Sequence, residues 1–464
     1  PRIYDFMKDV EIHAHQVGIP LRTRHNEVAP SQFEAAPMFG PVNVATDQNQ
    51  LLKDLMDRVA DHHGLKVLFH EKPFAGLNGS GKHNNWSLMT DTGVNLFQPT
   101  SSARENLMFL VFLIATIKAV HDHADLLRAT IASAGNDYRL GANEAPPAII
   151  SVFLGSTLSG VLDELERNGN IKIEKGDNLY MKLGIDQIPE IILDNTDRNR
   201  TSPFAFTGNK FEFRAVGGDA NVSNSMTVLN VIVADQLLDF HGKLVKKIDA
   251  GDEKRLAAIE ILRDYIKLSK KIRFEGDGYS LDWEKEAKKR GLSNVRDTPR
   301  ALDFLITEKS KSLFKRHGVL NEIEIQARHE IMLENYIMKV QIEARVIGDL
   351  ALNHIIPTAI IYQNKLIQNA NGLKGLEINA EDIIETIQDL SKHINRIKKL
   401  TSEMVEERKK VNKMEDSRTR AIAYCDQVKA KYFDQIRYSV DKLELLVDDE
   451  DWPLVKYREL LFLR

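Results

Sequence analysis

The sequence predicts an α+β fold that continues into a long helical segment at the C-terminal end. Three observations support this prediction. Helical and strand patterns alternate over residues 1–134, and strand and loop signals dominate residues 135–216. Helical patterns fill residues 222–345, and the residues after them carry apolar positions at three- and four-residue spacing. We therefore expect a mixed domain over 1–345 and a helical extension over 346–464.

The individual elements follow from periodicity and from the positions of glycine and proline. Apolar residues at helical spacing indicate helices, and short runs beside glycine-rich or proline-rich loops indicate strands. The predicted elements, in order, are a helix at 1–19, extended chain at 20–40, a helix at 48–63, a strand at 66–70, a glycine-rich loop at 74–81, a strand at 83–89 and a largely apolar helix at 102–134.

The C-terminal segment is predicted to contain two long helices. Glycine and asparagine at 369–375 indicate a loop, and Asn379 with Asp382 indicates the start of the next helix. The charge-rich stretch from Glu406 to Arg418 separates two runs of regularly spaced apolar residues. We expect these runs to be antiparallel helices, joined at a solvated turn, that pack against each other or against another subunit.

Composition narrows the possible functions. The chain has 464 residues, of which 43% are hydrophobic and 28% charged, and its formal net charge is −4. This balance is typical of globular proteins and gives no reason to expect a nucleic-acid partner. The longest apolar run, Leu107 to Ala115, is far shorter than the ~20 residues of a membrane span, so no membrane association is expected.

Two features of the sequence concern the cellular compartment and the N-terminal end of the chain. Its one cysteine, Cys425, excludes a disulfide framework within the chain and fits a cytoplasmic protein. Residue 1 is proline, and the residues after it have the pattern of a helix interior. We therefore expect further residues upstream.

A first candidate site is the segment His25-Asn-Glu27-Val-Ala-Pro-Ser-Gln-Phe-Glu34. On one regular strand Glu27 and Glu34 would point to opposite faces, but Pro30 favours a bend that brings them together. Two converging carboxylates suit Mg²⁺ or Mn²⁺. The alternative is a pair of exposed surface glutamates.

A second candidate is the loop Asn78-Gly79-Ser-Gly81 and the strand after it. Its glycines let backbone N–H groups approach an anion closely. In the strand, His83, Asn85 and Ser87 alternate onto one face, which offers an imidazole, an amide and a hydroxyl. An ordinary hairpin with no ligand would have the same pattern.

A third candidate is Lys210-Phe-Glu212-Phe-Arg214. Period two places Lys210, Glu212 and Arg214 on one face and the phenylalanines on the other. Charges backed by an aromatic core are costly unless they meet a ligand or water, so a metal-binding carboxylate between phosphate-binding cations is one explanation. An edge strand with mutual salt bridges is the other.

Two loops complete the candidates. Arg139 precedes Glu144 in a segment rich in glycine, asparagine and proline, and Arg200 ends the later Asp197-Arg-Asn-Arg run. Paired arginines suit a phosphorylated intermediate, and a loop carboxylate can be held over a site. Solvated surface loops would explain the same residues.

His121 and His123 fall in a predicted helix and point apart, so we do not expect them to share a metal.

Taken together and in this order, these segments resemble glutamine synthetase, and the helical tail resembles that of the long, type III enzymes. The matching segments are Glu27-Val-Ala-Pro-Ser-Gln-Phe-Glu34, Lys72-Pro-Phe-Ala-Gly-Leu-Asn-Gly-Ser-Gly81, Asn143-Glu-Ala-Pro and Lys210-Phe-Glu-Phe-Arg214, and the likeness covers roughly residues 20–235. The resemblance implies ATP-dependent ligation of ammonia to glutamate through γ-glutamyl phosphate. It also implies an antiparallel half-barrel with helices outside it, and a ring-based homo-oligomer, commonly a dodecamer.

The resemblance also implies roles for particular residues. Glu27 and Glu34 correspond to ligands of one Mg²⁺ or Mn²⁺, with His25 steadying the first, and His83 and Glu212 to ligands of a second. The other implied roles are glutamate binding for Asn78, Gly79 and Arg214, ATP binding for Asn85, Ser87 and Lys210, contact with the transferred phosphoryl group for Arg139 and Arg200, and closure of the site with proton acceptance from ammonium for Glu144.

The chain also departs from the family pattern. The family's first acidic strand and small N-terminal β domain are expected upstream of Pro1, and Lys210 stands where other types carry arginine. A glutamate–amine ligase such as a γ-glutamylpolyamine synthetase is an alternative, although the anionic Glu144 suits ammonium. A non-catalytic scaffold relative is a second alternative, against which the joint presence of the site residues argues.

Overall fold

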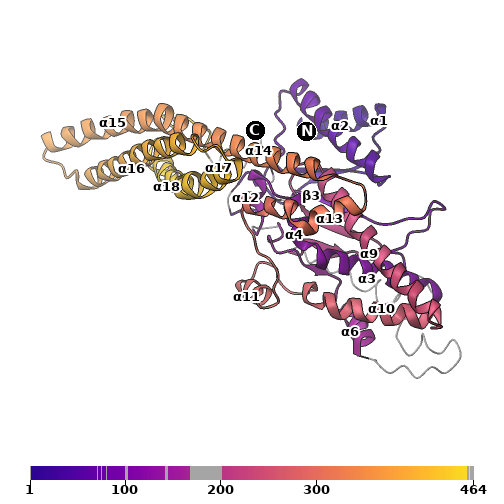
Figure 1. Cartoon of the computed structure of the whole chain (residues 1–464). Coiled ribbons are helices and arrows are strands. Elements are labelled where there is room, and N and C mark those ends of the chain that lie inside the picture. The colour runs from indigo at the N-terminus through magenta and orange to yellow at the C-terminus, as the bar shows by residue number, and fades with distance from the viewer. Residues whose placement is uncertain are drawn as a thin grey trace. The chain divides into compact units, whose positions relative to one another are not determined.

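The computed structural model describes residues 2–70, 72–74, 76–79, 81–99, 103–141, 145–167, 201–456 and 459. The chain divides into two compact units, at residues 1–325 and 326–464. Figure 1 shows the whole chain.

The first unit begins with a small subdomain around a β-hairpin. Helix α1 (Arg2–Gln16) and helix α2 (Val42–His62) flank strands β1 (Leu21–Asn26) and β2 (Phe33–Pro37). Val10, Ala14, Leu21, Leu52 and Val59 form its buried core. Helical spacing therefore predicted both helices, although α2 starts six residues earlier than the expected residue 48.

A four-stranded sheet lies at the centre of the first unit. Its order is β3-β6-β5-β4, formed by β3 (Lys82–Trp86), β6 (Phe211–Val216), β5 (Phe204–Phe206) and β4 (Val152–Phe153). The pairings of β3 with β6 and of β5 with β6 are antiparallel, and β4 runs parallel to β5. With the helices around it, this sheet confirms the predicted α+β class.

The helices that pack around this sheet share one large core. Phe204 stacks on Phe211, with ring centroids 4.6 Å apart, and Phe97 meets Phe211 edge to face. Apolar residues of the surrounding helices complete the core. The further helices of this unit are α3 (Ala103–Asp122), α4 (Ala124–Thr130), α5 (Ala134–Arg139), α6 (Ser156–Arg167), α9 (Ser223–Asp249), α10 (Lys254–Ser269), α11 (Leu281–Lys289), α12 (Thr298–Leu302) and α13 (Glu308–Arg316), with 3₁₀ turns η2 (Lys270–Ile272) and η3 (Asp303–Ile306).

One predicted strand of the first unit is wrong and another is shorter than expected. Residues 66–70, all described, form no strand, and of the strand predicted at 83–89 only residues 83–86 pair with the sheet. Among the described residues of 135–216, helices α5 and α6 accompany the predicted strands and loops. The segment 66–70 has a strand-like composition but no neighbouring edge to supply the hydrogen bonds that a strand needs.

The second unit is a set of long helices. Helix α14 (Glu322–Asp349) enters it and continues through a π turn, η4 (Leu350–Ile355), into α15 (Ile356–Gly375). The chain returns along α16 (Glu381–Val411) and runs out again through α17 (Ser417–Ala423), a second π turn η5 (Tyr424–Lys429) and α18 (Ala430–Leu446). Figure 1 shows α15, α16 and α18 side by side.

The core of the second unit confirms the predicted antiparallel pair of helices. Leu390 and Ile397 of α16 are fully buried, as are Val428 and Leu443 of the returning helix. The loop predicted at 369–375 is wrong, because α15 continues to Gly375 and the chain turns at 376–380. Ala370 is buried in this last stretch, so packing outweighs the weak helix propensity of its neighbours.

The continuous helix Glu322–Gly375 is long and apolar enough, by length and composition, to cross a membrane. The bent pair α3–α4 passes the same test when it is counted as one span. Core helices of soluble proteins share these features, so the two segments are weak evidence for a span.

Candidate metal and substrate site

The segment with the two glutamates folds as a hairpin. Strands β1 and β2 are antiparallel, and His25 lies directly opposite Glu34. The turn between the strands begins at Glu27, whose backbone N–H donates to the carbonyl of Gln32 at 3.0 Å. Ser31 adopts a positive φ of 56° in this turn. The bend that Pro30 favoured is thus a reversal of the whole chain, and it brings the glutamates to the same end of the hairpin.

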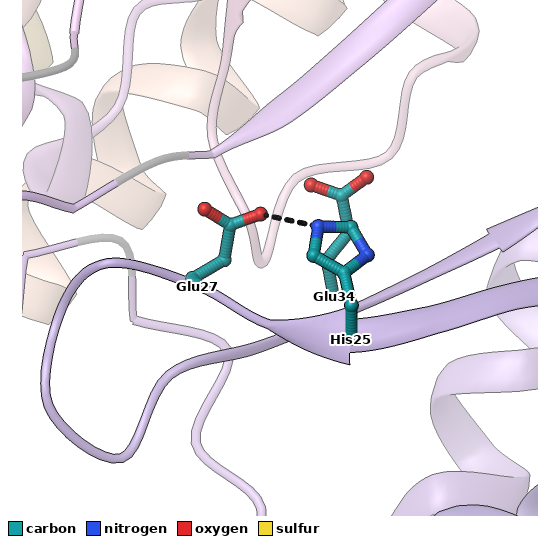
Figure 2. A group of neighbouring side chains, drawn as sticks. All are labelled: His25, Glu27 and Glu34. Atoms are coloured by element: carbon teal, nitrogen blue, oxygen red, sulfur yellow. Dashed lines mark hydrogen bonds and ion pairs between the residues drawn. The ribbon is translucent and has the colours of Figure 1, made fainter.

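The three hairpin side chains form a compact set of ligand atoms. One atom each from His25, Glu27 and Glu34 lies within 4.8 Å of the others. Figure 2 shows the His25 ring in front of Glu34 with Glu27 to one side, and Nε2 of His25 is 3.1 Å from Oε1 of Glu27. Burial raises the pKa of Glu34, and the neighbouring carboxylate of Glu27 raises it further. Two neighbouring carboxylates that repel each other, with an imidazole beside them, suit a hard divalent cation.

Strand β3 alternates as predicted. His83, Asn85 and Ser87 are exposed along one face, whereas Trp86 is buried on the other. The Trp86 indole donates a hydrogen bond to Oδ1 of Asn230 at 2.9 Å, which ties β3 to helix α9. The polar side chains of the exposed face are therefore carried by a strand that is anchored through its buried face.

Strand β6 lies next to β3 and carries the second acidic ligand candidate. Glu212 is partly buried, with Oε1 3.1 Å from Nδ1 of His83 and Oε2 2.7 Å from a terminal nitrogen of Arg214. Burial favours the neutral acid, but hydrogen bonds and charge from His83 and Arg214 outweigh it and hold the pKa of Glu212 at about 2. Glu212 is therefore ionised at neutral pH. Lys210 lies just before the strand and is partly exposed.

The hairpin lies within electrostatic range of the sheet. A positive charge on the His83 ring of β3 would favour ionisation of the Glu34 carboxyl. The same ring contacts Glu212. The His83 imidazole thus contacts the β6 carboxylate and is near enough to influence a hairpin carboxylate, although these segments are far apart in the sequence.

The glycine-rich loop enters the site beside β6. Asn78 is partly buried and Gly79 is buried. At Gly81 a side chain would not fit, because a Cβ there would lie 2.4 Å from the carbonyl oxygen of Val216 and 2.8 Å from Cζ of Arg139. The loop therefore passes directly over the end of β6, which only glycine allows.

Arg139 occupies a position that its sequence context did not indicate. Its side chain is fully buried, and it donates to the carbonyls of Arg214, at 2.7 Å, and Val216, at 3.3 Å. Its guanidinium therefore supports the end of β6. The predicted contact with a transferred phosphoryl group stays a prediction.

Asn136, which the sequence analysis did not single out, also supports β6. Its Nδ2 donates to the carbonyls of Ile131 and Ala215, at 2.7 and 2.9 Å, and its Oδ1 accepts from Arg139. The fully buried asparagine in a short helix is explained by these bonds. Only its nearness to Arg139 in the sequence could have drawn attention to it. Glu144 and Arg200 lie outside the described residues.

Comparison with known proteins gives consistent matches. A family model described as the catalytic domain of glutamine synthetase matches residues 2–151, and one described as the glutamine synthetase C-terminal domain matches residues 257–374. A glutamine synthetase of Bacteroides fragilis (strain YCH46) is 51% identical over 100% of this chain and 64% of its own length. A type-3 glutamine synthetase of Dictyostelium discoideum is 41% identical over 100% of this chain and 63% of its own length. The chain thus spans slightly less than two thirds of the length of these curated relatives.

Proposed function

Because this chain belongs to the glutamine synthetase family, we propose that the protein ligates ammonia to the γ-carboxylate of L-glutamate. ATP is the co-substrate, and the reaction passes through γ-glutamyl phosphate to L-glutamine, ADP and phosphate. The observation that carries this proposal is the cluster of hairpin ligands within electrostatic range of the paired His83 and Glu212.

Two divalent-cation positions, for Mg²⁺ or Mn²⁺, are part of the proposal. Glu27 and Glu34 hold one cation, with His25 orienting Glu27 through its 3.1 Å contact. His83 and Glu212 hold the other. Carboxylate and imidazole donors of this kind fit such ions, and the low pKa of Glu212 keeps it in the ligating form. When bound, the cations supply charge neutralisation for the phosphates and the reacting carboxylate.

The chain's own residues then position the substrates. Arg214 grips a carboxylate of glutamate, and Asn78 and Gly79 hold its backbone groups. The exposed face of β3, with Asn85 and Ser87, and the partly exposed Lys210 serve ATP. Since phosphoryl transfer asks mainly for positioning and charge stabilisation, polar groups on a rigid sheet suit it.

The remaining roles fall to three loop or helix residues. Arg200 faces the transferred phosphoryl group, and Glu144 closes the site and accepts a proton from ammonium, which needs a base shielded from water. Arg139 is proposed for the same phosphoryl group, and its guanidinium also donates to the carbonyls of Arg214 and Val216.

The larger architecture is proposed on the same basis. The mainly antiparallel sheet is part of a half-barrel within a catalytic domain over 1–345, and residues 346–464 are its helical extension. The protein assembles into a ring-based homo-oligomer, a dodecamer, in the cytoplasm. Closed rings are the usual result of head-to-tail contacts between identical subunits.

Glutamate-dependent phosphate release from ATP tests the function. The intact protein is assayed with Mg²⁺, with and without ammonium, beside Glu144→Ala. We expect release that depends on ammonium, yields glutamine and falls by at least about 100-fold in the variant, as for loss of a general base. Release that depends on a polyamine but not on ammonium would overturn the ammonia assignment, and no turnover with any amine would overturn the enzyme assignment.

A further inference from the structure

The helical unit contains a hydrogen-bonded junction that the proposed reaction does not use. The Tyr424 hydroxyl, at the start of η5, donates to Oδ1 of Asn412 at 2.5 Å. Nε2 of Gln341, on α14, donates to the same oxygen at 2.8 Å and contacts the Tyr424 hydroxyl at 3.1 Å. Tyr424 is fully buried. Three helical segments that are separate in the sequence therefore meet at one point.

Each residue of this junction has an arginine four positions away on its own segment. These are Arg345 beside Gln341 on α14, Arg408 beside Asn412 at the end of α16, and Arg420 beside Tyr424 across α17. Side chains four residues apart on a helix lie on the same face, one turn from each other. The three guanidiniums are therefore brought to the junction by the helices that form it.

The surroundings of Tyr424 agree with this placement. Burial raises the pKa of Tyr424, and the positive charges of Arg408, Arg345 and Arg420 each act in the opposite direction. Such an effect requires each guanidinium to lie within electrostatic range of the buried hydroxyl. The junction is thus surrounded by three positive charges.

Within the described residues, the side chains of these three arginines have no hydrogen bond or ion pair. Nη1 of Arg408 and Nε of Arg420 are buried without an acceptor. Exposed Arg437 on α18, by contrast, pairs with Asp441. A buried donor without an acceptor costs about 1–3 kcal/mol, and like charges add repulsion. An arginine cluster with these properties is complementary to an anion.

We propose that Arg345, Arg408 and Arg420 form a binding site for a small multivalent oxyanion that carries phosphoryl or carboxylate groups. The planar guanidinium fork matches both kinds of group and binds them with paired hydrogen bonds. The buried unpaired nitrogens of Arg408 and Arg420 supply the donors. A bound anion would link α14, α16 and α17, and this site shares no residue with the proposed catalytic site.

Calorimetric titration of the full chain with inorganic pyrophosphate and, separately, with citrate tests the proposal. The titrations are done in EDTA at constant ionic strength, so that neither divalent cations nor general screening contributes. We expect at least one probe to bind, and Arg408→Gln and Arg420→Gln each to weaken it about tenfold or more. Arg437→Gln is the matched control and should leave the affinity unchanged. The tighter probe identifies the ligand as phosphoryl or carboxylate.

A second measurement locates the site and guards against misfolded variants. Hydrogen exchange with the bound probe should show new protection over residues 408–424. Without the probe, Arg408→Gln should melt at the same or a higher temperature than the wild type, because it removes a repulsive charge. Equal affinity in Arg408→Gln and Arg437→Gln would overturn the proposal, as would protection confined to 25–34 and 81–87. Absence of binding together with a changed oligomeric mass in Arg408→Gln would replace it with a contact between copies.

Discussion

At the scale of single residues, Glu212 holds the candidate site together. It accepts from the buried Arg214 on one side and contacts His83 on the other. The alternation that puts Glu212 on one face of β6 and its buried phenylalanine neighbours on the other could be predicted, because period two is a local property of a strand. The bracing of β6 by Asn136 and Arg139 could not, because their acceptors are backbone carbonyls about 75 residues away, and backbone carbonyls have no sequence signature.

Glu212→Gln should weaken both the fold and cation binding. The variant removes the carboxylate that pairs with Arg214, whose side chain is 4% exposed, and breaking a buried pair costs on the order of 3 kcal/mol. Urea unfolding and Mn²⁺ titration measure the two effects. Glu260→Gln is the control, since its pair with Lys247 is solvent-exposed and its loss should cost less than about 1 kcal/mol. Equal destabilisation in both variants would contradict the account of Glu212.

Gly81→Ala should reduce stability and ammonium-dependent turnover together. The added Cβ meets a backbone oxygen at 2.4 Å, so either the loop or the end of β6 must move. Gly242→Ala in α9 has open space around it and should stabilise the protein by roughly 0.5–1 kcal/mol, as expected for a helical glycine. Thermal melting and initial rates compare the two. A Gly81→Ala protein with unchanged melting temperature and rate would show that the close approach is unimportant.

At the scale of elements, periodicity predicted the long helices well and the chain reversals poorly. Residues 381–411 and 417–446 keep their apolar spacing over many turns, and both are helical as expected. Residues 369–375 look like a loop by composition, but burial of Ala370 against the unit keeps them helical. For residues 66–70 the error is the opposite one: composition predicted regular structure, and none forms. A strand requires a partner edge, which a single segment cannot specify.

The junction of α3 and α4 should make the first unit sensitive to mild acid. Burial lowers the pKa of His123 to about 4, and the positive charge of Lys309 contributes. The unfolded chain takes up this proton near pH 6.5, so the stability is complete above that value and is lost as pH falls towards 4. Unfolding at pH 7 and pH 5 should differ by up to about 2 kcal/mol from this group. His123→Gln should lose this component of the pH dependence, and an unchanged profile in the variant would contradict it.

At the scale of the whole molecule, the site depends on contacts that no local pattern reveals. The hairpin carboxylates, the β3 imidazole and the β6 carboxylate come from segments up to 187 residues apart, from His25 to Glu212. Periodicity placed each group on a face of its own element. Only the family resemblance predicted that these faces meet, because the resemblance carries the tertiary arrangement of other proteins. The fold class followed from pattern, whereas the site followed from likeness.

Cation binding should stabilise the unit that contains the hairpin. A ligand that binds only the folded state at 100 times its Kd adds about 2.7 kcal/mol to the free energy of unfolding. Calorimetric melting in Mn²⁺ and in EDTA should therefore show a shift to higher temperature with the metal. Glu34→Gln should abolish most of this shift, whereas Glu260→Gln should keep it. A shift of the same size in both variants would place the cation elsewhere.

The π turn η4 also has a consequence for how this gene can change. A π turn holds one residue more than the α-helix it interrupts, and α15 follows it without a break. Deleting one codon within residues 350–355 would remove the extra residue and leave a regular helix, so the residues after it would keep nearly the same faces. Ala359 and Ala370 would then stay in the interior that they now occupy. A one-residue deletion should therefore be tolerated better in this stretch than within α15, where it would rotate everything after it by about 100°.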